Sequence, residues 1–331
     1  MTLYLHGVGH FHPDIEITNR FLEELDIGTS ESWIVERVGI HSRRTTLPLD
    51  YIRSTRNRDP RAASEAAVYD TAELGRRAAE RALERAGIGP EDVGLVLAGG
   101  CASDLSTPAE ACEIAGRLGV DAPALDVGSA CTSFLAQLSL LSKMRAEALP
   151  EFVLLVVQEA MTRSVCYDDR STAVLFGDAA AAAVVSSRAP AAARVVHADI
   201  ASDPSAADKV RIPRLGHFVQ EGRAVQLFAI RKSLEALARL ESARGEDGRP
   251  LHLVGHQANL RVLQAVCERA GVGAERHHTN VAHYGNTGAA SAPSVLSQAW
   301  DRFRPGDDVA LVGVGAGLTW GGALVRFEAA A

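Results

Sequence analysis

Five short runs of apolar residues recur along the chain and predict buried strands. They are bounded by glycine, proline or polar residues and are too short for buried helices. Their apolar character is continuous rather than alternating, which is typical of strands covered on both faces of a sheet. The runs are Val93–Ala98, Phe152–Val157, Ala180–Val185, Leu251–His256 and Val309–Gly313.

Segments with helical signals alternate with these strands. Ser30 is a suitable N-cap and Gly39 a suitable stop for a helix between them, and Gly87 ends a charged helix over Thr71–Ala86. Further helices are expected over Ala109–Leu118, Ala224–Ala243 and Leu260–Ala270.

The second half of the chain repeats the strand and helix order of the first. An Ala- and Pro-rich joint at Arg188–Ala193 separates the halves. We therefore predict an α/β fold with an internal duplication, in which two mixed sheets pack around central helices. The predicted domains are residues 1–188, which carry a candidate nucleophile, and residues 189–331.

The candidate nucleophile is Cys131, in the segment LDVGSACTSF over residues 125–134. Apolar Leu125 and Val127 precede a Gly-Ser-Ala turn, and a long apolar segment follows from Phe134. This pattern predicts a strand, a tight turn and a buried helix, with the thiol in the first helical turn. A buried structural cysteine is the alternative interpretation.

A helix N-terminus favours a thiolate through its free N–H groups and its dipole. The effect reaches about 2 kcal/mol at most, and one pKa unit is about 1.36 kcal/mol. Because this amounts to about one pKa unit, a partner base is needed.

Three later segments offer partners for Cys131. His256 stands at a strand-to-helix junction, Asn286 stands at another helix start, and the glycine-rich residues 315–322 offer unhindered N–H groups. Together they form a nucleophile, two hydrogen-bond donors and an oxyanion loop. Taken singly, His256 is also explained as a structural histidine and Asn286 as a helix cap.

Two groups of polar residues near the N-terminus are ambiguous. Trp33 and Arg37 share one helix face, which suits a nucleobase or a pantetheine phosphate, although a Trp that anchors an amphipathic helix is the common explanation. Residues 41–64 are rich in Arg. They are interpreted as a solvated loop, with a docking surface for an acidic carrier protein as the alternative.

Composition excludes several classes of protein. The chain has 331 residues, 47% of them hydrophobic, and a net charge of −7, which argues against nucleic acid as a partner. There is neither an apolar run long enough to span a membrane nor a signal peptide, so we expect a cytoplasmic protein. The five scattered cysteines indicate neither a disulfide framework nor a zinc site.

Five ordered motifs resemble the beta-ketoacyl-ACP synthase III (FabH-like) branch of the thiolase superfamily. The resemblance spans nearly the whole chain. It implies a five-layered αβαβα fold, a homodimer, and no cofactor beyond CoA or phosphopantetheine thioesters as substrates. The motifs are GSACTSF, FGDAAAAAVV, GHQANLR, HYGNTGAASAP and GAGLTWGGALVRF.

The resemblance also implies roles for single residues. Cys131, His256 and Asn286 would be a catalytic triad, and the N–H groups of Cys131 and Gly317 would form the oxyanion hole. A carrier protein would dock near Arg261. Residues expected to contact CoA or phosphopantetheine are Trp33, Arg37, Arg170 and Asn259.

The implied reaction is a condensation in two stages. An acyl group passes to Cys131, and a malonyl-type or beta-ketoacyl carrier-protein thioester then condenses with it. Thr107 stands where fatty-acid-initiating relatives carry a bulky aromatic residue, so a longer or wider acyl channel is expected. Further departures from the pattern of the family are Gly255, Ala179, Ala181 and Gln226. Together with Thr107, they predict a medium or long acyl substrate in polyketide or fatty-acid-derived secondary metabolism.

Two other functions are compatible with the residues. One is an acyltransferase on the same fold that esterifies a small molecule. The other is a catalytically silent partner that binds carrier proteins, which the complete Cys-His-Asn set disfavours.

Overall fold

The computed structural model describes residues 2–214, 216–245 and 248–329. Ten strands form one hydrogen-bonded sheet in the order β12-β11-β13-β14-β8-β1-β7-β6-β4-β5. The N-terminal strands are β1 (Leu3–Phe11), β4 (Val93–Gly99), β5 (Ala124–Asp126), β6 (Phe152–Ala160) and β7 (Asp178–Ser186). The C-terminal strands are β8 (Ala193–Ser202), β11 (Leu251–Gly255), β12 (His277–His278), β13 (Asp308–Gly315) and β14 (Thr319–Phe327).

The two halves of the sheet have the same topology. The five strands of each half can be numbered by their order in the chain. From the outer edge of each half-sheet inward, they then follow the order third, second, fourth, fifth, first. The parallel and antiparallel pairings of the two halves also correspond. Two separate sheets were expected, but β1 pairs with β8 through Leu3–Leu5 and joins them. The topology agrees with an internal duplication, and the domain division at residue 188 stays a prediction.

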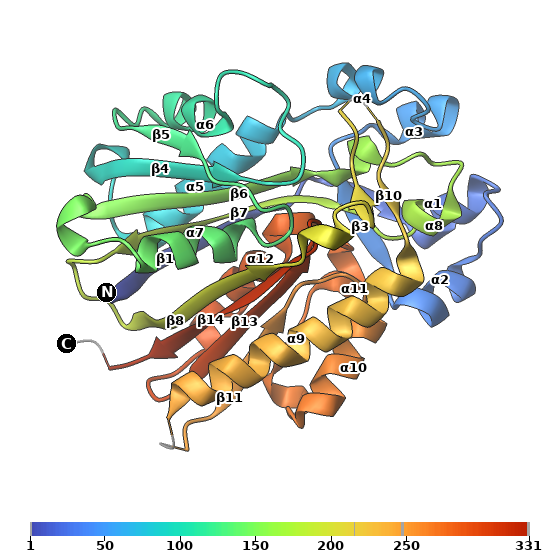
Figure 1. Cartoon of the computed structure of the whole chain (residues 1–331). Coiled ribbons are helices and arrows are strands. Elements are labelled where there is room, and N and C mark those ends of the chain that lie inside the picture. The colour runs from blue at the N-terminus through green and yellow to red at the C-terminus, as the bar shows by residue number, and fades with distance from the viewer. Residues whose placement is uncertain (1, 215, 246–247, 330–331) are drawn as a thin grey trace.

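Helices complete a five-layered arrangement (Figure 1). Helices α7 (Ser133–Ser142) and α12 (Ser291–Ala299) contact strands of both half-sheets and lie between them. Helices α5 (Thr71–Ala86) and α6 (Glu110–Leu118) cover the N-terminal half-sheet, and α9 (Gly222–Arg244) and α10 (Leu260–Ala270) cover the C-terminal one. The predicted α/β class and layering are confirmed.

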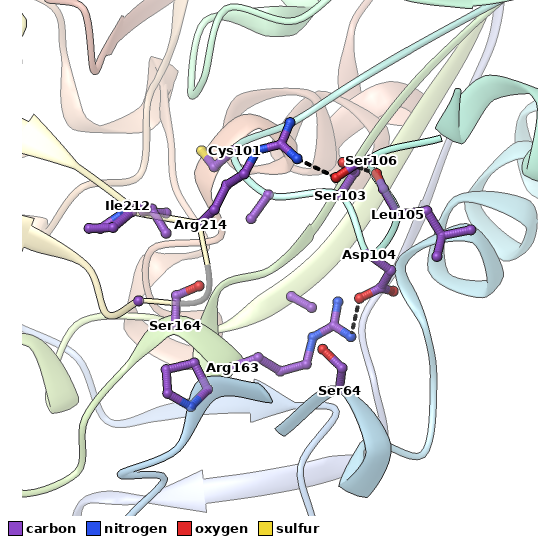
Figure 2. A pocket seen from close by; sticks show the side chains of 15 residues that line it. Ser64, Cys101, Ser103, Asp104, Leu105, Ser106, Arg163, Ser164, Ile212 and Arg214 are labelled. Atoms are coloured by element: carbon purple, nitrogen blue, oxygen red, sulfur yellow. Dashed lines mark hydrogen bonds and ion pairs between the residues drawn. The ribbon is translucent and has the colours of Figure 1, made fainter. Parts of the chain in front are cut away.

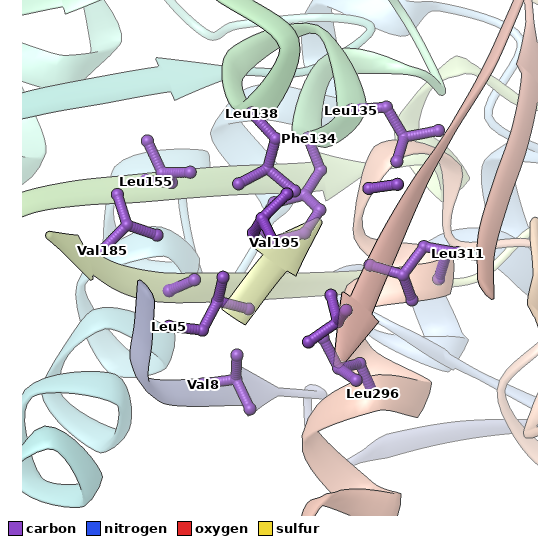
Figure 3. Close-up of a cluster of buried hydrophobic side chains, with 14 of the residues drawn as sticks. Leu5, Val8, Phe134, Leu135, Leu138, Leu155, Val185, Val195, Leu296 and Leu311 are labelled. Carbon is purple, nitrogen blue, oxygen red and sulfur yellow. The ribbon is translucent and has the colours of Figure 1, made fainter. Parts of the chain in front are cut away.

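The central layer is held by apolar side chains from both halves. Figure 3 shows Phe134 and Leu138 of α7 and Leu296 of α12 facing strand residues such as Leu155 and Leu311. All five are buried. Because the interior is close-packed, truncating such a Leu to Ala costs about 2–5 kcal/mol of stability.

Shorter elements gather at one end of the sheet, beside the predicted site. The N-terminal ones include β2 (Ile15–Thr18), α1 (Asn19–Glu24), α2 (Glu31–Val38), β3 (Ser42–Thr45), α3 (Leu49–Thr55) and α4 (Pro60–Ala66). Later ones include α8 (Arg170–Ala173), β9 (Val210–Arg211), β10 (Val219–Gln220) and α11 (Val281–Tyr284).

The interpretation of residues 41–64 as a solvated loop is wrong. The segment forms β3, α3 and part of α4, and Arg43 is fully buried. Its guanidinium donates to Asn19 Oδ1 at 2.6 Å and to the Val174 carbonyl at 2.5 Å. Burial lowers the Arg43 pKa to about 9. Arg43 is therefore a structural cross-link between β3 and two other segments, which the Arg-rich composition did not indicate.

Helix α5 packs directly on the backbone of β1. A Cβ at Gly9 would overlap the Ala78 carbonyl oxygen, and one at Gly7 the Ala82 carbonyl oxygen. The buried alanines of α5 leave the helix surface shallow, so helix and strand backbones approach closely. Glycine at these positions is required by packing and not by dihedral angles.

We predict that Gly9→Ala lowers the free energy of unfolding by about 1–3 kcal/mol, because the added methyl group meets helix backbone. Gly116→Ala is the control, since its Cβ would meet nothing within 4 Å in the interior of α6. The control should be stabilised by up to about 1 kcal/mol. Urea unfolding curves measure both changes, and equal midpoints for the two variants would contradict the packing described.

Candidate active site

A tight turn before α7 presents Cys131. Ala130 has a positive φ of 45°, which is uncommon for a residue with a side chain. The Ser133 hydroxyl accepts the Ser129 N–H at 2.9 Å and donates to the Ala130 carbonyl at 2.6 Å, so it holds the turn on both sides. The expected strand, turn and helix are present. However, α7 begins at Ser133 with Thr132 as its cap, so Cys131 lies just before the first helical turn.

The C-terminal loop packs on the Cys131 turn. A Cβ at Gly315 would approach the Cys131 nitrogen to 3.1 Å and its Cβ to 3.3 Å, so only a glycine fits this contact without a shift. Thr132 Oγ1 and Thr319 Oγ1 lie 2.8 Å apart and join the two segments by a hydrogen bond. The predicted glycine-rich loop is thus adjacent to the thiol.

His256 follows the last residue of β11, and its N–H is held by the Val312 carbonyl at 2.8 Å. Its Nδ1 lies 2.7 Å from Ser291 Oγ at the start of α12. The same hydroxyl oxygen accepts the Gln257 N–H at 3.2 Å. Ser291 therefore fixes the imidazole orientation and leaves Nε2 for another partner. Nothing in the sequence pattern indicated Ser291.

Asn286 is held by its backbone and by one side of its amide. Its N–H donates to the Leu175 carbonyl at 2.8 Å, and its carbonyl accepts the Gly177 N–H at 3.0 Å. The side-chain Oδ1 accepts the Gly288 N–H at 3.0 Å. Because this hydrogen bond occupies the amide oxygen, the NH₂ group is left as the free donor.

One cavity of about 260 Å³ brings the three residues together. Cys131, His256 and Asn286 all line it, with Gln226 and several apolar side chains around them. The apolar wall includes Phe176, Phe218, Val225, Phe228, Val314 and Leu318. Three segments distant in the sequence thus converge on one cavity that offers a thiol, an imidazole and an amide donor.

Comparison with known proteins identifies the family. Residues 125–204 match the family described as 3-Oxoacyl-[acyl-carrier-protein (ACP)] synthase III, and residues 248–327 match its C-terminal part. The chain is 31% identical to the beta-ketoacyl-[acyl-carrier-protein] synthase III of Oceanobacillus iheyensis over 99% of both chains. The chain belongs to the beta-ketoacyl-ACP synthase III family.

Solved structures of family members superpose on the whole chain. The 3-oxoacyl-[acyl-carrier-protein] synthase III of Aquifex aeolicus VF5 has a TM-score of 0.86 and 28% identity, covering 98% of this chain and 100% of the other. The priming beta-ketosynthase of the R1128 polyketide pathway has a TM-score of 0.80 and 29% identity, covering 98% and 96%. The thiolase-like fold expected from the resemblance is therefore confirmed.

The surroundings of Cys131 favour its thiolate. The hydrogen bond from Cys101 lowers the Cys131 pKa most. Burial acts in the opposite direction, and the charge of His256 and its hydrogen bond lower the pKa further. The outcome is a Cys131 pKa well below that of an ordinary thiol. The sequence predicted that Cys131 needs a partner in addition to the helix terminus, and the structure places two beside it, Cys101 and His256.

The sequence pattern did not single out Cys101, but the structure places it beside Cys131. Its sulfur lies 3.8 Å from the Cys131 sulfur. Its N–H donates to both carboxyl oxygens of Glu159 at 3.1 Å. The hydrogen bond to Cys131 and burial hold the Cys101 pKa well above its usual range, so Cys101 stays the proton donor of the pair.

Glu159 holds the pair of Cys101 and Cys131 in place through its contact with the Cys101 backbone. It is buried, and Oε1 also accepts the Ala289 N–H at 2.8 Å. Burial and the negative charge of Cys131 raise the Glu159 pKa to about 8, so the carboxyl is largely protonated at neutral pH. The sequence pattern does not connect Cys101, Glu159 and Cys131, because they lie at or after the ends of three different strands, β4, β6 and β5.

The residues expected to bind CoA gather near the cavity. The guanidinium carbon of Arg37 lies 5.9 Å from the Trp33 ring centroid and that of Arg170 lies 5.1 Å from it. Asn259 lines the cavity, and its Oδ1 accepts the Val262 N–H at 2.9 Å as the cap of α10. Their roles toward CoA stay predictions.

The other candidate site residues do not line the cavity. Gly317 is not among the residues that line the cavity, although its neighbours Ala316 and Leu318 are. Thr107 is exposed and does not line the cavity, so its effect on an acyl channel stays a prediction. Arg261 is exposed and donates to the carbonyls of Glu36 and Val35 at the end of α2, where a cation complements the helix dipole.

Two findings concern membranes and metals. No described helix is both long and apolar enough to cross a membrane. Within the described ranges, no group of three or more His, Cys, Asp or Glu side chains is arranged to hold a metal ion.

We predict that Cys101→Ala slows alkylation of Cys131 by iodoacetamide at pH 6.5 about tenfold. A hydrogen bond to a charged group contributes about 1.5–3 kcal/mol, and 1.4 kcal/mol is a factor of ten. Alkylation is followed over pH by mass spectrometry of the Cys131 peptide.

Cys101→Ser keeps a donor and should retain most of the reactivity. Cys112→Ala is the matched control, because Cys112 is exposed and its thiol donates to the Ala124 carbonyl, away from Cys131. A pH profile in Cys101→Ala that coincides with the parent profile would refute the assigned hydrogen bond.

Proposed function

We propose that this chain is a condensing enzyme that carries an acyl group on Cys131. The acyl donor is an acyl-CoA or an acyl carrier protein, and the second substrate is a malonyl or beta-ketoacyl carrier-protein thioester. The pathway is polyketide or fatty-acid-derived secondary metabolism in the cytoplasm, and the enzyme works as a homodimer. The names of the family relatives, including a polyketide priming ketosynthase, support this assignment.

Acyl transfer is the first step. The Cys131 thiolate attacks the thioester carbonyl carbon and forms a new carbon–sulfur bond. The N–H groups of Cys131 and Gly317 stabilise the oxyanion, and its collapse breaks the bond to the CoA or carrier sulfur, which leaves as a thiol after protonation. A low Cys131 pKa favours this step because the thiolate is the nucleophile.

Condensation is the second step. The malonyl group loses CO₂, and the bonding electron pair passes into an enolate. His256 Nε2 and the Asn286 NH₂ donate hydrogen bonds to the enolate oxygen. The enolate carbon attacks the acyl carbonyl, and the tetrahedral intermediate expels the Cys131 thiolate. The Ser291 contact to Nδ1 and the Gly288 contact to Oδ1 orient these donors toward the cavity.

The thioester arm is proposed to enter past Trp33. An indole face beside the guanidinium groups of Arg37 and Arg170 suits an adenine ring and phosphates. Asn259 would contact the pantetheine arm, and Arg261 would lie where a carrier protein docks. Thr107 of the partner subunit would leave space for a medium or long acyl group.

The single observation that carries the proposal is the convergence of Cys131, His256 and Asn286 on one cavity. The free amide donor favours condensation over simple acyl transfer, because an enolate needs a second donor in the transition state. One such donor is typically worth about 2.7–4 kcal/mol.

We predict that Asn286→Ala still forms the Cys131 adduct with an acyl-CoA but releases CO₂ from malonyl-ACP about 10²–10³ times more slowly, because one enolate donor is lost. Intact-protein mass spectrometry measures the adduct, and release of labelled CO₂ measures decarboxylation.

Gln226→Ala serves as a control, since Gln226 is exposed and lines the same cavity but is given no part in the proposed enolate site. Undiminished decarboxylation in Asn286→Ala would show that the assigned role is wrong. An adduct on the parent protein without any decarboxylation would instead favour an acyltransferase.

A further inference from the structure

A second cavity of about 400 Å³ lies beside the cavity that contains Cys131. Its lining comes from residues 101–106, from the short helix Met161–Ser164 and from residues 212–214 and 216, and α4 contributes to its wall. Figure 2 shows the labelled side chains arranged around this space. None of the residues lining the second cavity also lines the first.

The two cavities meet at the pair of cysteines. Cys131 lines the first and Cys101 the second, and their sulfur atoms are 3.8 Å apart. This distance is van der Waals contact between the two side chains. An acyl group bonded to the Cys131 sulfur would therefore start next to Cys101, which lines the second cavity.

A buried guanidinium points into the second cavity. Arg163 is only 7% exposed, and its Nη1 lies 2.6 Å from Asp104 Oδ1. The contact does not have hydrogen-bond geometry, and no other described residue accepts from this guanidinium. The second Asp104 oxygen is occupied by the Thr71 N–H at 2.8 Å and the Thr71 hydroxyl at 2.9 Å. Arg163 thus retains donor capacity in a nearly dry site, where a missing acceptor is costly.

A second arginine faces the same space. Arg214 is exposed, and its Nη1 donates to Ser106 Oγ. Figure 2 shows both guanidinium groups directed toward the loop that carries Ser103–Ser106. The charged side chains that line the cavity are those of Arg163, Arg214 and Asp104, so the lining has an excess of positive charge. The Glu110 carboxyl lies close enough to act on Arg163, and burial raises its pKa to about 7. Glu159, which adjoins Cys101, adds little negative charge at neutral pH because burial raises its pKa to about 8.

We infer that the second cavity receives the far end of the acyl group and selects acyl chains that end in a carboxylate, that is, monothioesters of dicarboxylic acids. This inference rests on the proposed function, because it assumes that Cys131 carries the acyl group. It narrows the expected medium or long acyl substrate to one chemical class.

The walls fit such a chain along its length. Pro60, Leu105 and Ile212 offer apolar surface to methylene groups, and both arginines line the same cavity. A terminal carboxylate would accept from guanidinium donors with good geometry and would add a second acceptor beside Asp104 for Arg163. A terminal methyl group at the same place would bury these donors without a partner, which is unfavourable.

The test compares two CoA thioesters of equal chain length, hexanoyl-CoA and 5-carboxypentanoyl-CoA, as donors to the full chain. Intact-protein mass spectrometry follows the rate of adduct formation on Cys131. We expect the carboxylated donor to react about 10 to 100 times faster, the factor that corresponds to one charge-assisted hydrogen bond.

Two variants test whether the second cavity causes the preference for the carboxylated donor. Arg214→Gln should reduce it several-fold without affecting folding, because Arg214 is exposed. Arg163→Gln should reduce it more strongly. Arg20→Gln is the matched control, since Arg20 is exposed, pairs with Glu24 and does not line the cavity.

The outcomes separate this inference from the proposed function. Equal or faster reaction with hexanoyl-CoA overturns the inference and leaves the proposed function intact. An unchanged preference in both Arg163→Gln and Arg214→Gln also overturns it. If neither donor, nor an acyl-CoA of any other chain length, forms an adduct, the proposed function itself is contradicted.

Discussion

Keeping a thiolate inside the protein is the physical constraint on which the site depends. Burial alone raises a thiol pKa, and the helix terminus next to Cys131 supplies too little to reverse this. The neighbouring Cys101 thiol and His256 supply the rest. Each of these is itself held by a second residue, Cys101 by Glu159 and His256 by Ser291. The charge on Cys131 therefore depends on a chain of hydrogen bonds that reaches three separate strands.

The duplicated topology brings these groups together. Both half-sheets have the same strand order, and the central helices α7 and α12 lie between them. The turn before α7 presents Cys131, and the start of α12 presents Ser291 to His256. Ligand sites in sheets of this kind form where strands end and connections begin. The cavity at Cys131 and the arginine-lined cavity behind Cys101 both lie at such ends.

Much of the fold and of the site could be predicted from the sequence, for physical reasons that apply to particular segments. The apolar strands are continuous because both of their faces are covered, and Ser30 and Gly39 delimit α2 as helix caps do. Cys131, His256 and Asn286 each stand at a junction that the pattern marks. Cys101, Ser291 and Arg163 were missed because their roles arise from contacts across distant segments. Arg43 was misinterpreted because composition does not reveal that a guanidinium is buried against Asn19.

The central claim is that Cys131 is the acyl-carrying thiol. The most direct measurement is peptide mapping by mass spectrometry after incubation of the full chain with a series of acyl-CoAs. The account predicts a thioester on the peptide that contains Cys131, lost in Cys131→Ala, and none on the peptides of Cys101, Cys112, Cys166 or Cys267. A protein that forms no adduct with any donor, or that forms it on another cysteine, would contradict the account.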